Sequence, residues 1–246
     1  MTNYLPSINI DRALKNGRSI HDGYQRGWGL QFGELKNKIL EDTLYLEALE
    51  VARGRTIMQE ENRMNLYLII RFFLEKIGNP GHIIEFGSYK GGNAIFMAYV
   101  AKRILPGVKV YAMDTFEGMP ETDKSIEMHS KGDFSGVDFD ELCSYSASIG
   151  LDNLEFRRGL FQDTAPTLMN GGAKFSLVHI DCDIGDAVKY SYEVSKPHMS
   201  KGGYWAFDDA TTSSCLGATE VIEEILLKRD GKNSEQIYPH YVFRAE

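Results

Sequence analysis

The chain has 246 residues, of which 43% are hydrophobic and 25% charged, enough apolar side chains for one sizeable core. Its 27 Lys and Arg against 35 Asp and Glu give a formal net charge of −8, which argues against a nucleic-acid partner and an anionic membrane surface. Cys143, Cys182 and Cys215 show no zinc-like spacing, and no apolar run suits a signal peptide or a membrane span. We therefore expect a cytoplasmic protein with reduced thiols.

Before residue 80 the sequence predicts two helices and a stretch without regular structure. Residues 1–35 are polar and rich in glycine, and we expect no regular structure there. Apolar residues at helical spacing predict helices over 34–53 and about 60–77, the second ending at a dense group of glycine, asparagine and proline. We interpret residues 1–55 as a partly helical N-terminal extension and residues 56–246 as the main domain.

In the remaining chain, short apolar runs alternate with amphipathic helical patterns. Strands are predicted over 83–86, 108–113, 154–158, 175–180 and 204–207, with a last strand over 237–243. Helices are predicted over 92–105, 139–149, 164–169, 186–199 and 216–228. Strict alternation of strand and helix implies right-handed crossovers and a mostly parallel sheet with helices on both faces, a Rossmann-like α/β fold.

Ligands of such sheets bind beyond the carboxyl ends of the strands. The first strand ends on Glu85 and is followed by Gly87 and the pair Gly91-Gly92, where a dinucleotide-binding turn would read GxGxxG. A carboxylate there would repel a pyrophosphate and suits a cationic ligand such as S-adenosylmethionine. Asp114, at the next strand end, would bind ribose hydroxyls in either cofactor class. The structural alternatives are a bare tight turn and a helix cap.

Two pairs of carboxylates follow two later strands, Asp181 with Asp183 and Asp208 with Asp209. Because one crossover helix separates these strands, we expect both pairs to meet at one edge of the sheet. Such a cluster is costly unless a cation joins it, and its oxygen ligands favour Mg²⁺ over Ca²⁺ or Mn²⁺. A bound Mg²⁺ could chelate vicinal hydroxyls and lower the pKa of one. The alternative is a set of N-caps for the following helices.

Laid out in this order, the chain resembles the macrocin O-methyltransferase family of sugar-modifying enzymes. The matching segments are Thr56-Ile-Met58, Glu85-Phe-Gly87, Lys90-Gly91-Gly92, Asp114-Thr115-Phe116-Glu117-Gly118-Met119-Pro120, Gly159-Leu-Phe161, His179-Ile-Asp181-Cys-Asp183, Phe207-Asp208-Asp209 and Gly217-Ala218. The resemblance implies a class I methyltransferase fold and dependence on both S-adenosylmethionine and Mg²⁺.

The resemblance also implies roles for individual residues. The metal ligands would be Asp181, Asp208 and Asp209. The methyl-donor site would comprise Met58, Glu85, Gly87, Ser88, Gly91, Asn93, Asp114, Thr115, Gly159 and Phe161. Residues 116–137 would form a lid over the sugar, and their composition is also typical of a mobile loop.

Four further residues have individual interpretations. Asp183 is the favoured general base and is grouped with Asp181 as catalytic, with an N-cap as the alternative for Asp183. Gly185 stands where many relatives carry tyrosine, which predicts a wider acceptor site. His179 is interpreted as a core histidine, and for His129, in the lid, exposure without a role is favoured.

The resulting hypothesis is metal-dependent methyl transfer from S-adenosylmethionine to a hydroxyl of a sugar or glycan-bearing small molecule with vicinal hydroxyls. Three alternatives stay open. They are a catechol-type phenolic O-methyltransferase, an NAD-dependent sugar-modifying oxidoreductase and a nucleoside-binding subunit without catalytic activity. The sequence leaves the identity of the sugar, the methylated hydroxyl and the formation of a homo-oligomer open.

Overall fold

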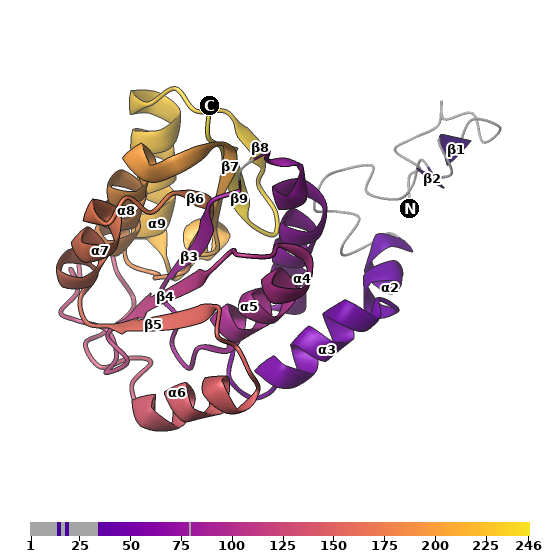
Figure 1. Ribbon diagram of the computed structural model, residues 1–246. Coiled ribbons are helices and arrows are strands. Elements are labelled where there is room, and N and C mark those ends of the chain that lie inside the picture. Colours follow the sequence, from indigo (N-terminus) through magenta and orange to yellow (C-terminus); the bar gives the residue numbers. More distant parts are fainter. Residues whose placement is uncertain (1–13, 16–17, 20–33, 79) are drawn as a thin grey trace, which may run out of the picture.

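Seven strands form one sheet in the order β5-β4-β3-β6-β7-β9-β8 (Figure 1). The computed structural model describes residues 14–15, 18–19, 34–78 and 80–246. The strands of this sheet are β3 (His82–Phe86), β4 (Val110–Asp114), β5 (Leu154–Arg158), β6 (Phe175–Ile180), β7 (Met199–Phe207), β8 (Ser234–Gln236) and β9 (Tyr241–Arg244). β3 to β7 pair in parallel, and β9 is antiparallel to both of its neighbours. The predicted α/β sheet of the Rossmann type is confirmed.

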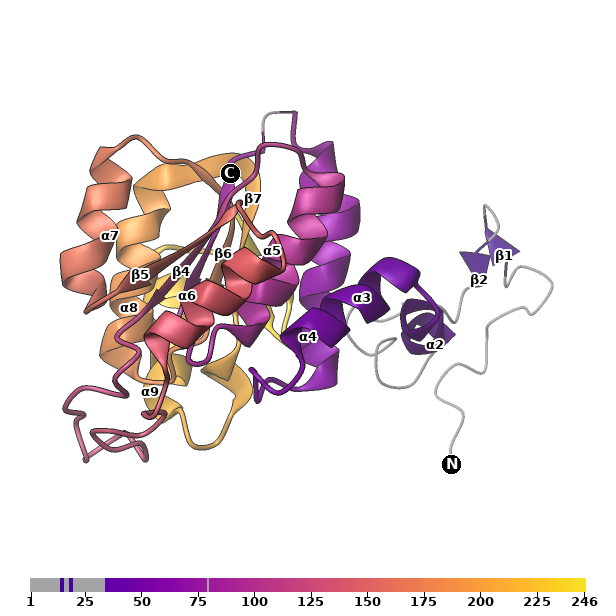
Figure 2. The same cartoon turned by 60° about the horizontal axis from the view of Figure 1, so that its bottom comes forward.

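Helices cover both faces of the sheet, as Figure 2 shows. One face carries α3 (Thr43–Ala52), α4 (Glu60–Leu68), α5 (Gly92–Ile104) and α6 (Phe139–Ser148). The other face carries α7 (Phe161–Asn170), α8 (Gly185–Ser195) and α9 (Leu216–Glu220). α4 continues through a π-helical segment and a 3₁₀ turn to Lys76, and α9 continues through a π-helical segment to Arg229. In the described residues, no helix is long and apolar enough to cross a membrane.

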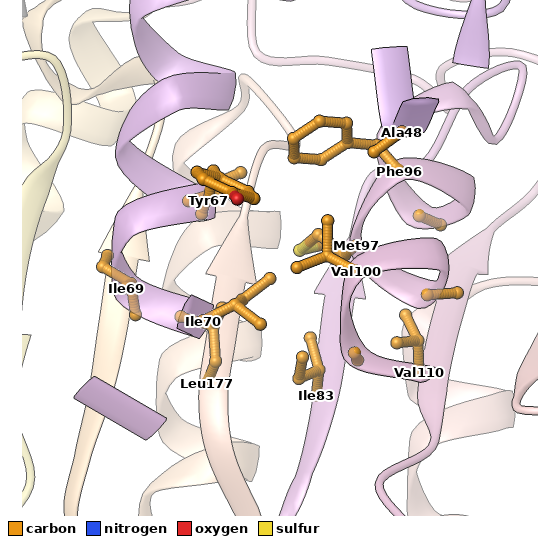
Figure 3. Close-up of a cluster of buried hydrophobic side chains, with 14 of the residues drawn as sticks. Ala48, Tyr67, Ile69, Ile70, Ile83, Phe96, Met97, Val100, Val110 and Leu177 are labelled. Atoms are coloured by element: carbon orange, nitrogen blue, oxygen red, sulfur yellow. The ribbon is translucent and has the colours of Figure 1, made fainter. Parts of the chain in front are cut away.

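The strands divide their side chains between two apolar clusters because successive residues point to opposite faces. Ile83 belongs to the cluster under α4 and α5, and its neighbour Ile84 to the cluster under α7 and α8. Figure 3 shows the first cluster, in which Tyr67 and Ile70 face Phe96 and Val100 above the strand residue Ile83. Both faces of β3, β4 and β6 are therefore buried, as their continuous apolar runs predict, whereas the edge strand β5 is only partly buried.

Several predicted boundaries are wrong. The helix expected over 34–53 is interrupted between α2 (Glu34–Leu40) and α3, because Asp42 caps α3 by accepting a 3.0 Å hydrogen bond from the Leu44 N–H. The single strand expected over 237–243 is the hairpin β8–β9, and Pro239, which has no N–H for a ladder, lies in its turn. β7 starts at Met199, inside the helix predicted over 186–199.

The N-terminal extension falls mainly outside the described residues. Within the stretch 1–35, β1 (Leu14–Lys15) pairs antiparallel with β2 (Arg18–Ser19), where no regular structure was predicted, and α2 begins at Glu34. α3 belongs to the main core, since its Tyr45 and Ala48 are fully buried in the cluster with α5.

Candidate functional site

A cavity of about 1140 Å³ lies at the carboxyl ends of the parallel strands. Most of the predicted site residues line it, namely Met58, Glu85, Gly87, Ser88, Asn93, Asp114, Thr115, Phe161, Asp181, Asp183, Asp208 and Asp209. Gly159 lines a neighbouring cavity of about 580 Å³ instead, and Gly91 lines neither of the two. The strand ends thus bring together residues that are far apart in the sequence, as the parallel topology requires.

The turn after β3 needs glycine for close packing. Gly87 has a φ of 90°, and a Cβ atom there would lie 1.7 Å from the carbonyl oxygen of Asp181. Gly91 caps α5 with a φ of 72°, and a Cβ there would meet Leu142 and Phe156 at 2.9 Å. A side chain at position 91 would therefore clash with these apolar residues, so glycine is needed there for packing. Gly91 does not line the cavity, contrary to its predicted place in the donor site.

Glu85 places a fully buried carboxylate on the cavity wall. Its Oε1 accepts a 2.5 Å hydrogen bond from Asn93 Nδ2 and lies 3.1 Å from Nδ1 of His179, which is fully buried as predicted for a core histidine. Among the described residues, Glu85 Oε2, Asn93 Oδ1 and Ser88 Oγ are buried without a hydrogen-bond partner. Since such orphaned groups are rare in folded proteins, this wall fits a polar ligand that donates hydrogen bonds.

Asp114 joins the glycine turn to the start of the lid. Its carboxylate accepts hydrogen bonds from the N–H groups of Ser88 at 2.9 Å, Tyr89 at 2.8 Å and Phe116 at 2.7 Å. Burial raises its pKa, and these hydrogen bonds oppose the rise. Thr115 Oγ1 donates to the carbonyl oxygen of Gly118 at 2.7 Å, which fixes the first turn of the lid. Asp114 is therefore a bridge between two loops as well as part of the cavity wall.

Asp181, Asp208 and Asp209 meet as predicted. Each offers a carboxylate oxygen within 4.8 Å of the other two. Burial and mutual repulsion raise the pKa of Asp181 and of Asp209 well above the usual range. A divalent cation would relieve this repulsion. The three carboxylates also supply the oxygen ligands that a cation such as Mg²⁺ prefers.

Asp208 differs from the other two because polar neighbours lower its pKa. Although burial acts against it, His240, with Nε2 3.0 Å from Oδ1, and Asn62, which donates its Nδ2 to Oδ1, hold the pKa of Asp208 below its usual value. Asn65 Nδ2 donates to His240 Nδ1 at 2.9 Å, so the other ring nitrogen, Nε2, faces Asp208. The sequence analysis missed His240 and Asn62, and no pattern in the sequence around either residue indicates these contacts.

Asp183 sits just behind the carboxylate cluster in a left-handed conformation, with a φ of 60°. Its N–H donates to Asp209 Oδ2 at 2.7 Å, and burial raises its pKa while His129 opposes the rise. The N-cap position of α8 is Ile184, so the helix-cap alternative for Asp183 is wrong. His129 Nε2 lies 3.4 Å from Asp183 Oδ1, so this lid histidine reaches the site although no role was expected for it.

Another lid residue, Glu127, was not singled out by the sequence analysis. Its carboxylate is buried, with Oε1 bonded to the N–H of Gly185 at 2.7 Å, and Oε2 has no partner among the described residues. Glu127 lines the main cavity. Gly185 also lines the main cavity, and a Cβ there would lie 2.9 Å from the backbone of Gly217, so the wider acceptor site stays a prediction. The glycine permits close contact between α8 and the start of α9.

Comparisons with known proteins agree with this geometry. Residues 52–225 match the model of the family described as macrocin-O-methyltransferase (TylF). The chain is 28% identical over 151 residues to the 8-demethyl-8-(2,3-dimethoxy-alpha-L-rhamnosyl)-tetracenomycin-C 4'-O-methyltransferase of Streptomyces olivaceus, an alignment that covers 57% of each protein. It is 26% identical over 155 residues to the mycinamicin III 3''-O-methyltransferase of Micromonospora griseorubida, covering 57% of this chain and 59% of that protein. The matches thus span somewhat more than half the length of these relatives.

The fold is also similar to a solved structure, that of the O-methyltransferase NovP. The TM-score is 0.68 with 19% sequence identity, and the superposition covers 78% of this chain and 83% of that one.

Proposed function

The chain belongs to the macrocin O-methyltransferase family, and from this premise we propose that it transfers a methyl group from S-adenosylmethionine to a hydroxyl of a sugar-bearing small molecule. One observation carries the proposal above all. The unpartnered carboxylate oxygen of Glu85 and the cluster of Asp181, Asp208 and Asp209 belong to the wall of one cavity. A cationic donor and a metal-chelated acceptor need acidic groups at these two neighbouring places.

The donor end of the cavity is built for the charges of S-adenosylmethionine. Glu85 Oε2 is free to accept a hydrogen bond from an ammonium group, because Asn93 and His179 contact only Oε1. Asp114, held by three backbone N–H groups, has the acceptor capacity for ribose hydroxyls. Phe161 packs edge-on against Phe86, with ring centroids 5.1 Å apart, and offers an apolar surface in the wall of the same cavity.

The acceptor end would hold Mg²⁺ on Asp181, Asp208 and Asp209. When bound, S-adenosylmethionine supplies the activated methyl group, and Mg²⁺ supplies the positive charge that lowers the pKa of an acceptor hydroxyl. Asp208, kept ionised by His240 and Asn62, would be the anchoring carboxylate of the three.

Asp183 is the residue that we propose takes the proton from the acceptor hydroxyl. It lines the cavity next to Asp209, and burial raises its pKa, which makes this carboxylate a stronger base than an exposed aspartate. The lid residue Glu127, whose Oε2 is unpartnered, would accept a hydrogen bond from another hydroxyl of the sugar. Positioning of the acceptor between lid and strand ends would then supply much of the rate enhancement.

A calorimetric titration tests the cofactor class first. S-adenosylhomocysteine should bind with micromolar affinity, and NAD⁺ should not bind. Glu85→Gln should weaken the binding of S-adenosylhomocysteine. Binding of NAD⁺ alone would contradict the proposal and support the oxidoreductase alternative. A screen of glycosides and catechols, each with Mg²⁺ and with a chelator, then separates a sugar acceptor from a planar phenolic one. Binding of S-adenosylhomocysteine without turnover of any acceptor would favour the subunit without catalytic activity.

A further inference from the structure

We infer that His129, Asp183 and Cys215 form a second metal site, one that binds Zn²⁺ and fastens the lid to the core. The three residues come from three separate segments: the lid, the turn between β6 and α8, and the residue just before α9. Their ligand atoms lie within 4.8 Å of one another, and no candidate magnesium ligand is among them.

The distances between the ligand atoms match the edges of a zinc tetrahedron. His129 Nε2 lies 3.4 Å and Cys215 Sγ 3.5 Å from Asp183 Oδ1, and Sγ lies 3.8 Å from Nε2. Zinc bonds of about 2.0 Å to nitrogen and oxygen and about 2.3 Å to sulfur, at tetrahedral angles, require separations of roughly 3.3, 3.5 and 3.5 Å. One ion can therefore contact all three side chains with almost no movement of them.

The surroundings of the cluster also fit a cation. Cys215 is fully buried, and the side chains of His129 and Asp183 are each 19% exposed. Asp133 Oδ2 lies 3.7 Å from the other ring nitrogen of His129, on the side where metal-bound imidazoles usually meet a carboxylate. Three protein ligands leave a fourth position for a water molecule.

The donor types separate this site from the magnesium site. A set of imidazole, thiolate and one carboxylate suits Zn²⁺, whereas the all-oxygen set of Asp181, Asp208 and Asp209 suits Mg²⁺. Binding of Zn²⁺ displaces the proton of the Cys215 thiol, which leaves to solvent, and forms the zinc–sulfur bond.

The site would hold the lid in place. Because Asp183 is also the proposed base, Zn²⁺ bound here would make its carboxylate a weaker base and slow the reaction. Asp183 lines the main cavity, but neither His129 nor Cys215 does. Of the three ligands only His129 belongs to the lid, so an ion bound here connects residues 116–137 to the turn after β6 and to the start of α9. This inference does not rest on the proposed function, because it requires neither donor nor acceptor.

Cobalt substitution tests the site through its sulfur ligand. The full chain, saturated with Mg²⁺ to occupy the three-aspartate cluster, is titrated with Co²⁺ and followed by absorption spectroscopy. We expect one equivalent to give a thiolate-to-cobalt charge-transfer band and the strong visible bands of tetrahedral Co²⁺. Cys215→Ala should abolish the charge-transfer band and His129→Ala should weaken binding at least tenfold. Cys143→Ser, at a half-buried cysteine on α6, should change neither. No charge-transfer band, or the same band in Cys215→Ala, would overturn the inference.

Proteolysis tests the fastening of the lid, which contains Lys124 and Lys131 as trypsin sites. If Zn²⁺ must leave before the lid opens, cleavage should slow about tenfold at a Zn²⁺ concentration ten times Kd. His129→Ala should be cleaved at the same rate with and without Zn²⁺. Equal protection of this variant and of the unmodified chain would show that Zn²⁺ acts elsewhere, and the fastening role would be wrong.

Discussion

The lid carboxylate of Glu127 accepts a 2.7 Å hydrogen bond from the backbone N–H of Gly185, the first residue of α8. This N–H has no partner within its own helix, and Ile184, at the N-cap position, offers no side-chain oxygen. The lid thus provides the cap that the sequence of α8 lacks. The negative charge also lies at the positive end of the helix dipole, which favours the closed position of the lid.

Glu127→Ala should release the lid. The substitution leaves the buried N–H of Gly185 without an acceptor, which costs roughly 1–3 kcal/mol, so trypsin should cleave at Lys124 about tenfold faster. Glu127→Gln keeps an acceptor oxygen and should stay close to the unmodified chain. Glu117→Ala is the matched control, because Glu117 belongs to the same lid but pairs with Arg158 on the surface. Equal cleavage of the two alanine variants would contradict the capping role.

Gly87→Ala should disrupt the donor site far more than an ordinary glycine substitution. A Cβ at Gly87 would lie 1.7 Å from the Asp181 carbonyl oxygen, so the ends of β3 and β6 must separate. We expect loss of S-adenosylhomocysteine binding and a fall in stability beyond the roughly 1–3 kcal/mol of backbone strain. Gly107→Ala isolates the strain, because Gly107 has a φ of 85° and open space around it. Calorimetry and thermal unfolding of the two variants make the comparison, and similar losses in both would rule out the contact with Asp181 as the cause.

The sequence predicts the acidic strand ends correctly for a topological reason. Parallel strands joined by crossover helices place all their carboxyl ends at one edge, so the position of each acid along its own strand is enough. Asp181 and Asp208 therefore meet as predicted, and so do Glu85 and Asp114 on the same cavity wall. The centre of the sheet is predictable because both faces of β3, β4 and β6 are buried and these strands read as continuous apolar runs.

The residues that the sequence does not reveal depend on contacts between distant segments. His240 reaches Asp208 because the C-terminal hairpin folds back beside β7, and nothing near His240 in the sequence indicates this contact. Glu127 and His129 lie in a loop whose path is set by side-chain contacts rather than by a repeating pattern. The break before α3 is a local exception, since Asp42 is a helix-capping residue type that the helical periodicity concealed.

Asp230 should make the stability of the protein depend on pH in the acid range. Arg229, Lys196 and Tyr192 donate hydrogen bonds to its carboxylate and lower its pKa in the folded state. A lowered folded pKa stabilises the protein above the unfolded value of about 3.9, and this contribution is lost as the pH falls below it. Asp230→Asn should therefore reduce the free energy of unfolding by about 1 kcal/mol at pH 7, with a smaller difference at pH 3.

Urea unfolding at pH 7, 5 and 3 measures this effect. The difference between Asp230→Asn and the unmodified chain should be equal at the two higher values. Glu224→Gln, which removes an exposed pair with Lys228, is the control and should show little difference at any of them. A difference that grows toward pH 3 would have the wrong sign for a lowered pKa.

His240→Ala should weaken the metal site without affecting the donor. His240 is fully buried, with its Nε2 3.0 Å from Asp208 Oδ1. It holds that carboxylate in place and lowers its pKa, which favours the charged form. Loss of such a supporting residue typically costs 10–100-fold in metal affinity, so Mg²⁺ binding should weaken by about that factor in calorimetry. His240→Gln, which keeps a polar group with N–H donors at this position, should recover part of the loss. His198→Ala is the control, since His198 lies in the turn before β7. Unchanged Mg²⁺ affinity in His240→Ala would remove this role.

Asp208→Asn should abolish catalysis while the donor site stays intact. The amide keeps the size of the side chain but removes the charge that would anchor Mg²⁺. The rate at which the enzyme methylates its acceptor should therefore fall at least ~100-fold. The affinity for S-adenosylhomocysteine should change less than about threefold, because Asp208 is not among the residues proposed to bind the donor, and Glu85 and Asp114 are kept. Asp152→Asn, which removes an exposed pair with Lys102, should leave both quantities unchanged. The same assay on the unmodified chain, with a chelator in place of Mg²⁺, should reproduce the loss. Full turnover with the chelator would mean that the three aspartates serve some purpose other than holding a catalytic metal.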